Sequence, residues 1–168
     1  MTLRAIAPIL ALVALTTLSA CGFRPLYATA GDDYKTAANM AQVKVELIND
    51  RVGQLTRNAL IETLTPRGQS SSPLYDLSVT LTESTSEQGF TKDNEATIAD
   101  YQITAKYEVS RRSDTKILRK GEVRARTSYN IVDSDFASIE AEDAARKDAA
   151  RNLAQQLANQ VAIGLRSQ

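Results

Sequence analysis

The feature that most constrains the fold is the alternation of apolar and polar residues in three segments between residues 74 and 131. In the first segment, residues 74–83, apolar side chains occupy every second position: Tyr75, Leu77, Val79 and Leu81. Successive side chains of a β-strand point to opposite faces of a sheet, so this spacing predicts a strand with one buried and one solvated face. The polar stretch that follows, residues 84–94, contains Gly89 and predicts a long hairpin loop.

The second and third segments predict a long antiparallel hairpin. Residues 96–110 carry apolar side chains at every second position, and residues 116–131 repeat that pattern after the polar turn Arg111-Arg112-Ser113-Asp114. In the returning strand, one face holds Val123, Ala125, Thr127, Tyr129 and Ile131, whereas the other holds Lys120, Glu122, Arg124, Arg126 and Ser128. The hairpin is therefore expected to bury one face and to expose a charged one.

One more strand and one helix precede these segments. Residues 42–48 alternate as a strand, with Val43, Val45 and Leu47 on the apolar face. Residues 51–65 place their apolar side chains within about half of a helical wheel. This predicted helix follows an N-cap signal at Asn49-Asp50 and stops at Pro66-Arg67-Gly68.

A second, longer helix is predicted at the C-terminal end. It begins after an N-cap at Ser134 or Asp135 and runs to about Leu165. Its apolar residues fall within about 120° of the helical wheel; they are Phe136, Ile139, Ala150, Leu153, Ala154, Leu157, Val161 and Leu165. Opposite charges at i, i+4 spacing, Glu142 with Arg146 and Asp143 with Lys147, support this helix.

The order of these elements is β-α-β-β-β-α, and each element shows one apolar face. Two helices on one face of a four-stranded mixed sheet would bury all of those faces, which predicts an α+β two-layer sandwich. A helix between the first two strands favours their parallel placement through a right-handed crossover. Residues 41–168 are expected to form this single domain.

The N-terminal segment predicts a lipoprotein signal peptide rather than part of the fold. Arg4 precedes an apolar run of roughly 14 residues, which is shorter than the ~20 residues that span a bilayer. The run ends in Leu18-Ser19-Ala20-Cys21-Gly22, which resembles the lipobox of bacterial lipoproteins. Residues 1–20 are then a signal peptide, and Cys21 is the lipidation site. Two or more palmitate-type acyl chains there would anchor the protein stably to a membrane.

Residues 21–40 predict a lipidated tether without regular structure. Gly22, Pro25, Gly31 and Asp32 interrupt any strand or helix period. Gly22 stands where an Asp would favour retention at the inner membrane in enterobacterial lipoproteins. By that resemblance, the expected location is the periplasmic face of the cell outer membrane.

The composition argues against an enzyme, a cofactor or a metal site. The chain has no His and no Trp, and Cys21 is its only cysteine. These absences remove the usual metal ligands, the common general base and the thiol nucleophile. The balance of 20 basic and 20 acidic residues also gives no global field that would attract nucleic acid.

The lipobox, the start Cys21-Gly22-Phe23-Arg24-Pro25-Leu26-Tyr27 and the β-α-β-β-β-α order together resemble the LptE-type lipopolysaccharide-assembly lipoproteins. The resemblance covers essentially the whole chain after Cys21, although Pro25 and Tyr27 depart from the usual start of the family. It implies a protein that plugs and supports the assembly of the outer-membrane β-barrel LptD, and that helps to insert lipopolysaccharide into the outer leaflet. Its partners would be an LptD-like barrel and lipopolysaccharide.

The candidate residues for binding lipopolysaccharide are basic side chains of one hairpin. They are Arg111, Arg112, Lys116, Arg119, Lys120, Arg124 and Arg126. Guanidinium groups bind phosphate through paired hydrogen bonds, and lipid A phosphates are the obvious anions in this compartment. The alternative is that these are solvated side chains of a sheet, balanced in part by Glu108 and Glu122.

Two other functions are consistent with the sequence. The first is an unrelated envelope lipoprotein that acts as a ligand-binding or scaffold module. The second is a hydrolase that uses paired carboxylates, for which Asp93 with Glu95 and Asp133 with Asp135 are the local candidates. No nucleophile and base stand at a suitable spacing beside them.

Overall fold

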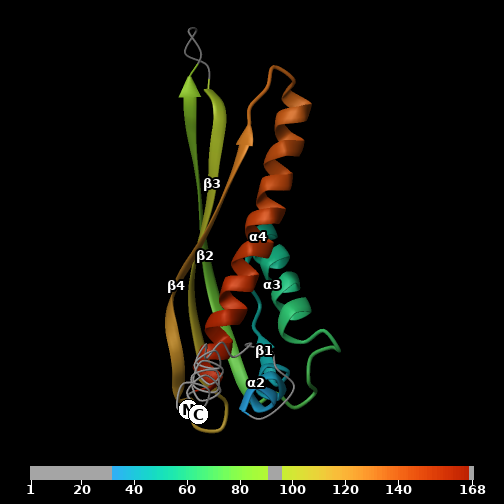
Figure 1. Ribbon diagram of the computed structural model, residues 1–168, viewed down its shortest axis with the longest axis vertical. Helices are drawn as coiled ribbons and strands as arrows, with labels where there is room; N and C mark the ends of the chain where they lie inside the picture. The colour runs from blue at the N-terminus through green and yellow to red at the C-terminus, as the bar shows by residue number, and fades with distance from the viewer. Residues whose placement is uncertain (1–31, 91–95, 167–168) are drawn as a thin grey trace, which may run out of the picture.

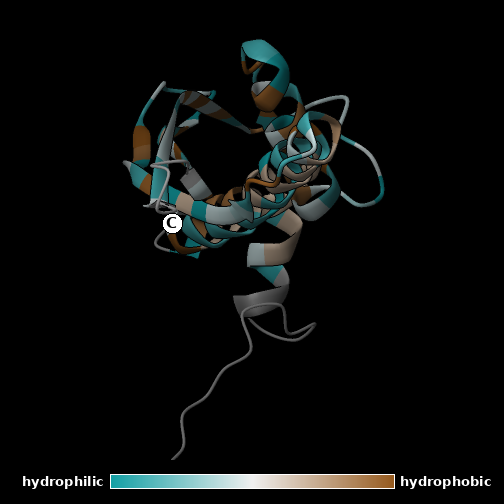
Figure 2. Cartoon of the chain, turned by 90° about the horizontal axis from the view of Figure 1, so that it is seen from above, coloured by the Kyte–Doolittle hydropathy of each residue, from teal (hydrophilic) through white to brown (hydrophobic). Residues whose placement is uncertain are grey.

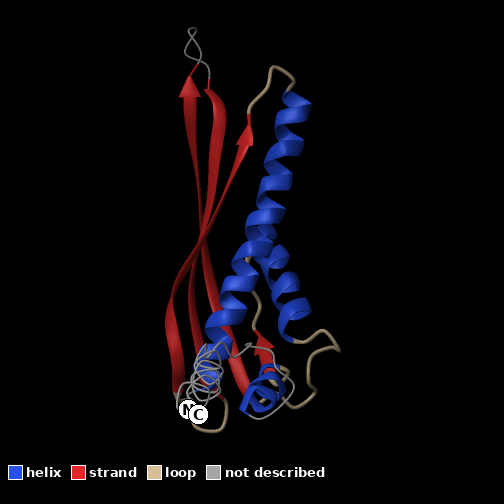
Figure 3. Cartoon of the chain, in the orientation of Figure 1, coloured by secondary structure: helices blue, strands red, loops and turns tan. Residues whose placement is uncertain are grey.

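The computed structural model describes residues 32–90 and 96–166 (Figures 1 and 3). Its elements are α2 (Asp32–Met40), β1 (Val43–Val45), α3 (Asp50–Leu64), β2 (Tyr75–Phe90), β3 (Ala96–Arg111), β4 (Ile117–Asn130) and α4 (Asp135–Arg166). The predicted signal peptide and the lipidation site Cys21 lie outside the described residues.

The four strands form one mixed sheet in the order β1-β2-β3-β4. β1 runs parallel to β2, with Val43 opposite Tyr75, and α3 connects the two strands. β2, β3 and β4 pair antiparallel as a meander. The predicted mixed sheet, the parallel first pair and the long hairpin of β3 and β4 are confirmed.

The helices α3 and α4 lie on one face of this sheet, and no element of residues 32–90 and 96–166 covers the other, which we call the open face (Figure 1). Hydrophobic and hydrophilic bands follow one another along the strands, as alternation predicts (Figure 2). The core between the layers contains fully buried side chains from β1, β2, β3, α3 and α4; they include Val45, Leu60, Leu77, Ile103, Val109, Leu153, Leu157 and Val161. Each such side chain contributes about 1.5–3 kcal/mol relative to an exposed one. The two-layer fold therefore rests on the predicted apolar faces.

The two ends of the molecule are formed by different elements. We call proximal the end that holds α2, the β3–β4 turn and the last turns of α4, and distal the end where β4 stops and α4 begins (Figure 1). At the distal end Ser134 is the N-cap of α4, because its Oγ accepts a hydrogen bond from the Ala137 N–H at 3.4 Å. The 32 residues of α4 then run back along the sheet to the proximal end.

The first turns of α4 correct one prediction. Phe136 and Ile139 were expected on the buried face, but they are 74% and 60% exposed, and the buried residues of α4 begin only at Ala145. Their positions on the helical wheel do continue the buried stripe. They stay exposed because α4 is about 48 Å long at 1.5 Å per residue, whereas α3, with 15 residues, covers less than half of that length.

The predicted loop at residues 84–94 is also wrong over residues 84–90, because β2 continues to Phe90. Each residue from Ser84 to Gln88 lies opposite a β3 residue, for example Glu87 opposite Ala99. The side chains of residues 84–88 are exposed, although Ala99, Asp100 and Tyr101 opposite them on β3 are buried, so this part of β2 needs no apolar alternation. Backbone pairing with β3 satisfies the N–H and C=O groups instead.

The segment around β1 differs from its prediction in two ways. β1 is only three residues long, and Leu47 is 74% exposed rather than buried. The chain turns toward α3 after Glu46, whose N–H still bonds the Leu77 carbonyl at 3.0 Å, and Ile48 becomes the buried side chain. The last part of the predicted tether is helical, since α2 occupies residues 32–40 and buries Thr36 and Met40.

Candidate functional site

The proposed anion-binding residues surround the β3–β4 turn at the proximal end. The turn is closed by a backbone hydrogen bond from the Arg111 N–H to the Lys116 carbonyl at 2.9 Å, and the Arg112 N–H joins it to the Leu74 carbonyl, also at 2.9 Å, just before β2. The Asp114 carboxylate accepts from Arg111 Nη1 and from the Lys116 backbone N–H, each at 3.3 Å. The turn is therefore organised by its own acidic residue.

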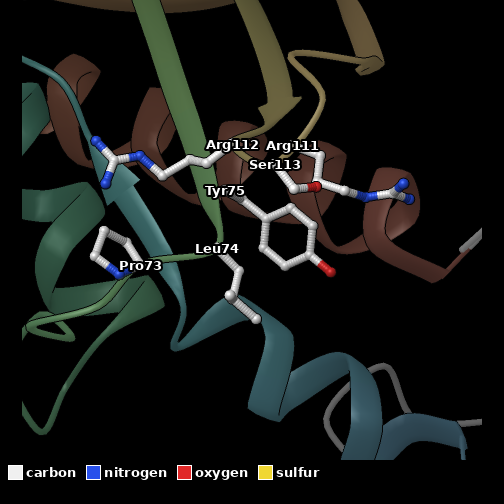
Figure 4. Close-up of a pocket in the computed structure, with 6 residues that line it drawn as sticks. All are labelled: Pro73, Leu74, Tyr75, Arg111, Arg112 and Ser113. Carbon is white, nitrogen blue, oxygen red and sulfur yellow. The ribbon is translucent and has the colours of Figure 1, made fainter.

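The sheet separates the seven basic candidates onto two faces. Arg111 lies opposite the buried Tyr75 and shares its face, whereas Arg112 reaches Asp76 on the open face with a 2.8 Å hydrogen bond. In Figure 4 these two guanidinium groups extend in opposite directions from the end of the hairpin. Lys120, Arg124 and Arg126 also lie on the open face, because they alternate with the partly buried Val123 and the buried Ala125. Lys116 is exposed in the turn.

Arg119 does not belong to the open-face group. Its stem packs against Gly164 of α4, where an added Cβ would lie 2.9 Å from the Arg119 Cβ. Its Nε and Nη2 donate to Gln160 Oε1 at 2.9 and 2.6 Å, and the Tyr107 hydroxyl donates to the same oxygen at 3.2 Å. A register shift in β4 next to Val109 accompanies this placement. Arg119 therefore joins β4 to α4 and takes a structural role.

Ion pairs hold several of the open-face cations. Arg124 pairs with Glu122, and Arg126 pairs with Asp100 on the neighbouring strand. The Arg126 guanidinium, followed by the Ser128 hydroxyl, holds the pKa of Asp100 below its usual value. Among the described residues no carboxylate lies within ion-pair distance of Lys120. The alternative, in which neighbouring carboxylates balance solvated basic side chains, thus describes Arg124 and Arg126 better than Lys120.

Two open depressions lie beside these cations. One, of about 580 Å³, is lined by Pro73, Leu74, Tyr75, Arg111, Arg112 and Ser113 (Figure 4). The other, of about 610 Å³, lies over Gly121 and is lined by alternating charges and hydroxyls: Ser78, Thr80, Lys106, Glu108, Lys120 and Glu122. Both are shallow, so they suit the head group of a large ligand at the surface more than an enclosed small molecule.

A polar cluster between the layers was missed by sequence reasoning. The Tyr101 hydroxyl donates to Glu83 Oε2 at 2.5 Å, and the Arg146 guanidinium carbon lies 5.6 Å from the centroid of the Tyr101 ring. Burial, and then the Glu83 carboxylate, raise the pKa of Tyr101 above its ordinary value. The available signal was Glu83, which stands at an apolar position of the β2 alternation.

The carboxylate pairs considered for catalysis gain no support as a site. Asp133 and Asp135 are exposed at the start of α4, and Asp93 and Glu95 lie outside the described residues. Within residues 32–90 and 96–166, no three metal-ligating side chains are grouped as a metal site would require. No helix in that part of the chain has the length and apolar character to cross a bilayer.

Several solved structures share this fold. Solved structures with the same fold include a candidate lipoprotein of Caulobacter crescentus CB15, with a TM-score of 0.66 and 20% identity, covering 82% of this chain and 100% of that one. Rare lipoprotein B of Shewanella oneidensis has a TM-score of 0.56 and 9% identity, covering 72% and 93% of the two chains. A minor lipoprotein of Acinetobacter baumannii has a TM-score of 0.54 and 18% identity, covering 72% and 90%.

A search of curated protein sequences gave no match. The family model for lipopolysaccharide assembly, LptE, matches residues 40–161, which include nearly the whole described domain. This match spans well over half of the 168 residues. The chain therefore belongs to the LptE family of lipopolysaccharide-assembly proteins.

Proposed function

We propose that this protein is a non-enzymatic outer-membrane lipoprotein that plugs and supports an LptD-like β-barrel and assists the insertion of lipopolysaccharide into the outer leaflet. The observation that carries this proposal is the LptE family match over residues 40–161. Lipidation at Cys21 would hold the protein at the periplasmic face of the outer membrane.

The open face of the sheet supports the role of a plug. Along β2 this face carries Ser78, Thr80 and Thr82, and on β3 and β4 it carries charged side chains of both signs. The lumen of an outer-membrane barrel is polar and hydrated. A compact domain with one polar, solvated face fits such a lumen better than it fits hydrocarbon.

We also propose that the proximal basic residues contact lipopolysaccharide phosphates. The candidates for this site are Arg111, Arg112, Lys116 and Lys120 at the proximal end, with Arg124 and Arg126 further along the open face. Lys120 has no ion-pair partner among the described residues, whereas Arg111, Arg112, Arg124 and Arg126 each pair with a carboxylate. Arg119 is left out, because its guanidinium is bound by Gln160. The two depressions at Arg112 and Lys120 leave room for a head group next to those cations.

Purification of the tagged, lipidated chain from gently solubilised outer membranes tests the main proposal. We expect a large β-barrel protein to be recovered in equal amount and to lose stability when this lipoprotein is depleted. Recovery of the lipoprotein alone, or with periplasmic proteins only, would argue for the alternative of an unrelated ligand-binding or scaffold lipoprotein.

Charge reversal tests the lipopolysaccharide site. We expect Arg111→Glu, Arg112→Glu and Lys120→Glu combined to raise the dissociation constant for lipopolysaccharide about tenfold or more, because charge-assisted hydrogen bonds to phosphate become repulsive contacts. Lys147→Glu, at an exposed position of α4, is the matched control and should leave the affinity unchanged. Equal affinity of the triple variant and the control would remove these residues from the site.

A further inference from the structure

The distal end of the molecule carries apolar side chains that nothing in the described domain covers. Phe136 and Ile139, at 74% and 60% exposure, lie one turn apart on α4, and Val132 precedes them at 48%. Phe136 and Ile139 continue the stripe that further along α4 packs Leu153 and Leu157 into the core. A buried stripe that runs on into solvent is typical of a surface that a partner covers.

The outer part of β2 is uncovered at the same level, whereas Ala99 and Tyr101 opposite it on β3 are buried. On the face of β2 that carries Leu77 and Val79, the positions nearer the distal end are Glu83 and Glu87, and both are exposed. In Figure 1 the distal turns of α4 rise beyond the end of α3. Toward the distal end, the first turns of α4 and the outer part of β2 thus expose side chains on the faces that are buried elsewhere.

This end is also acidic, although the whole chain is neutral. Residues 79–90, 96–105 and 127–145 contain no Lys and no Arg. Their carboxylates are Glu83, Glu87, Asp100, Asp133, Asp135, Glu140, Glu142 and Asp143. The basic residues Lys106, Arg111, Arg112, Lys116, Arg119, Lys120, Arg124 and Arg126 fall in the next stretch of the hairpin. That stretch also contains Glu108, Asp114 and Glu122, but its net charge is positive, whereas the distal stretches have a net negative charge.

Internal pairing accounts for only part of the acidic group. Asp100 pairs with Arg126, Glu142 pairs with Arg146, and Asp143 pairs with Arg51 and Arg146. Among the described residues, Glu87, Asp133, Asp135 and Glu140 have no ion-pair partner, and all four are exposed. Asp135 also suits the N-terminus of α4, but Glu87 is on a strand and gains nothing from the helix dipole.

We propose that Phe136 and Ile139, rimmed by Asp135 and Glu140, form a docking surface for a protein segment that presents apolar side chains flanked by Lys or Arg. Burial of the two apolar side chains supplies affinity, and the carboxylates select a cationic rim. If the proposed function holds, that segment belongs to the barrel, and this surface then fixes which end of the domain lies deepest in its lumen.

The same observations disfavour two other occupants. Phosphates of lipopolysaccharide or of a phospholipid surface would meet carboxylates with no cation among residues 127–145. A second copy of the chain, docked by a two-fold axis through this surface, would place one acidic rim against another. Both arrangements are repulsive, whereas a basic protein segment is complementary.

Photo-cross-linking in the intact outer membrane tests the proposal. A benzoylphenylalanine is placed at position 136 of the full lipidated chain, and in a control chain at position 47, which has the same 74% exposure. We expect position 136 to attach to a protein segment with Lys or Arg next to its apolar residues, and Asp135→Lys with Glu140→Lys to reduce that product about tenfold. Attachment to lipid, to a second copy, or to nothing overturns the proposal, as does equal attachment from position 47.

A second measurement separates this proposal from the proposed function. We expect Phe136→Ser with Ile139→Ser to lower the co-recovered partner about tenfold or more, since two exposed apolar contacts are lost, while the unfolding temperature stays close to that of the unmodified chain. Leu47→Ser is the control. If the unmodified chain recovers a barrel and the double variant recovers as much, the docking surface is wrong and the barrel partnership stands. If the unmodified chain recovers no barrel, the partnership fails, and the cross-link from position 136 decides the docking surface.

Discussion

Replacing Leu157 with alanine is expected to lower the free energy of unfolding by about 2–5 kcal/mol, the range for removing a buried leucine side chain. Leu157 is fully buried on α4, where the helix crosses the sheet. Truncation removes three carbons from the core and leaves a cavity that the long, straight α4 cannot close without moving. Urea unfolding followed by circular dichroism measures the change.

Leu47→Ala is the matched control for this prediction. Leu47 has the same side chain but is 74% exposed in the connection between β1 and α3. We expect its effect to stay within about 0.5 kcal/mol, as for most surface substitutions. If the two variants unfold at the same urea concentration, then α4 does not pack on the sheet through the described stripe.

Gln160→Leu is expected to lower the free energy of unfolding by about 1–3 kcal/mol, because the guanidinium of Arg119 then loses its acceptor between β4 and α4. Gln160 Oε1 accepts from Arg119 Nε and Nη2 and from the Tyr107 hydroxyl. Leucine has a similar size, so the change removes hydrogen bonds with little change in packing volume. Urea unfolding again gives the size of the effect.

Gln155→Leu serves as the control, since Gln155 is exposed on the same helix. The double variant Arg119→Met with Gln160→Leu should recover part of the lost stability, because neither partner then remains unpaired. Effects that simply add in the double variant would contradict a direct Arg119–Gln160 interaction. The series also tests whether Arg119 stabilises the fold rather than binding a ligand.

The sequence predicted the elements of this fold wherever one face is buried along the whole element. The alternation of Leu77 and Val79 in β2, and the 3.6-residue spacing of Leu153 and Leu157 in α4, both record contact with the core. Prediction was wrong where that contact ends. The outer half of β2 has no apolar pattern because its side chains are exposed to solvent. Phe136 stands at the helical spacing of a core residue, but no core lies beside it.

The candidate site was predicted as one basic cluster. The basic side chains are divided between the two faces of the sheet, because successive residues of a strand point to opposite faces. Residue type alone places Arg112, Arg119 and Lys120 together, but their side chains leave the sheet on different faces. The side on which Arg119 lies was implicit in its spacing from Val123 and Ala125. The sequence did not predict that Arg119 binds Gln160, which lies 41 residues away in the chain. No local pattern encodes a contact between a strand and a distant helix.

By itself the sequence determined the number, type and order of the main elements, and it predicted the lipid anchor at Cys21, because periodicity and short motifs are local properties of a chain. Only the tertiary structure decided the length over which α4 is covered, the face from which each cation projects, and the gathering of net negative charge at the distal end. Those features depend on where one element stops relative to another. They arise from packing between residues far apart in the chain, which the local spacing of residues does not record.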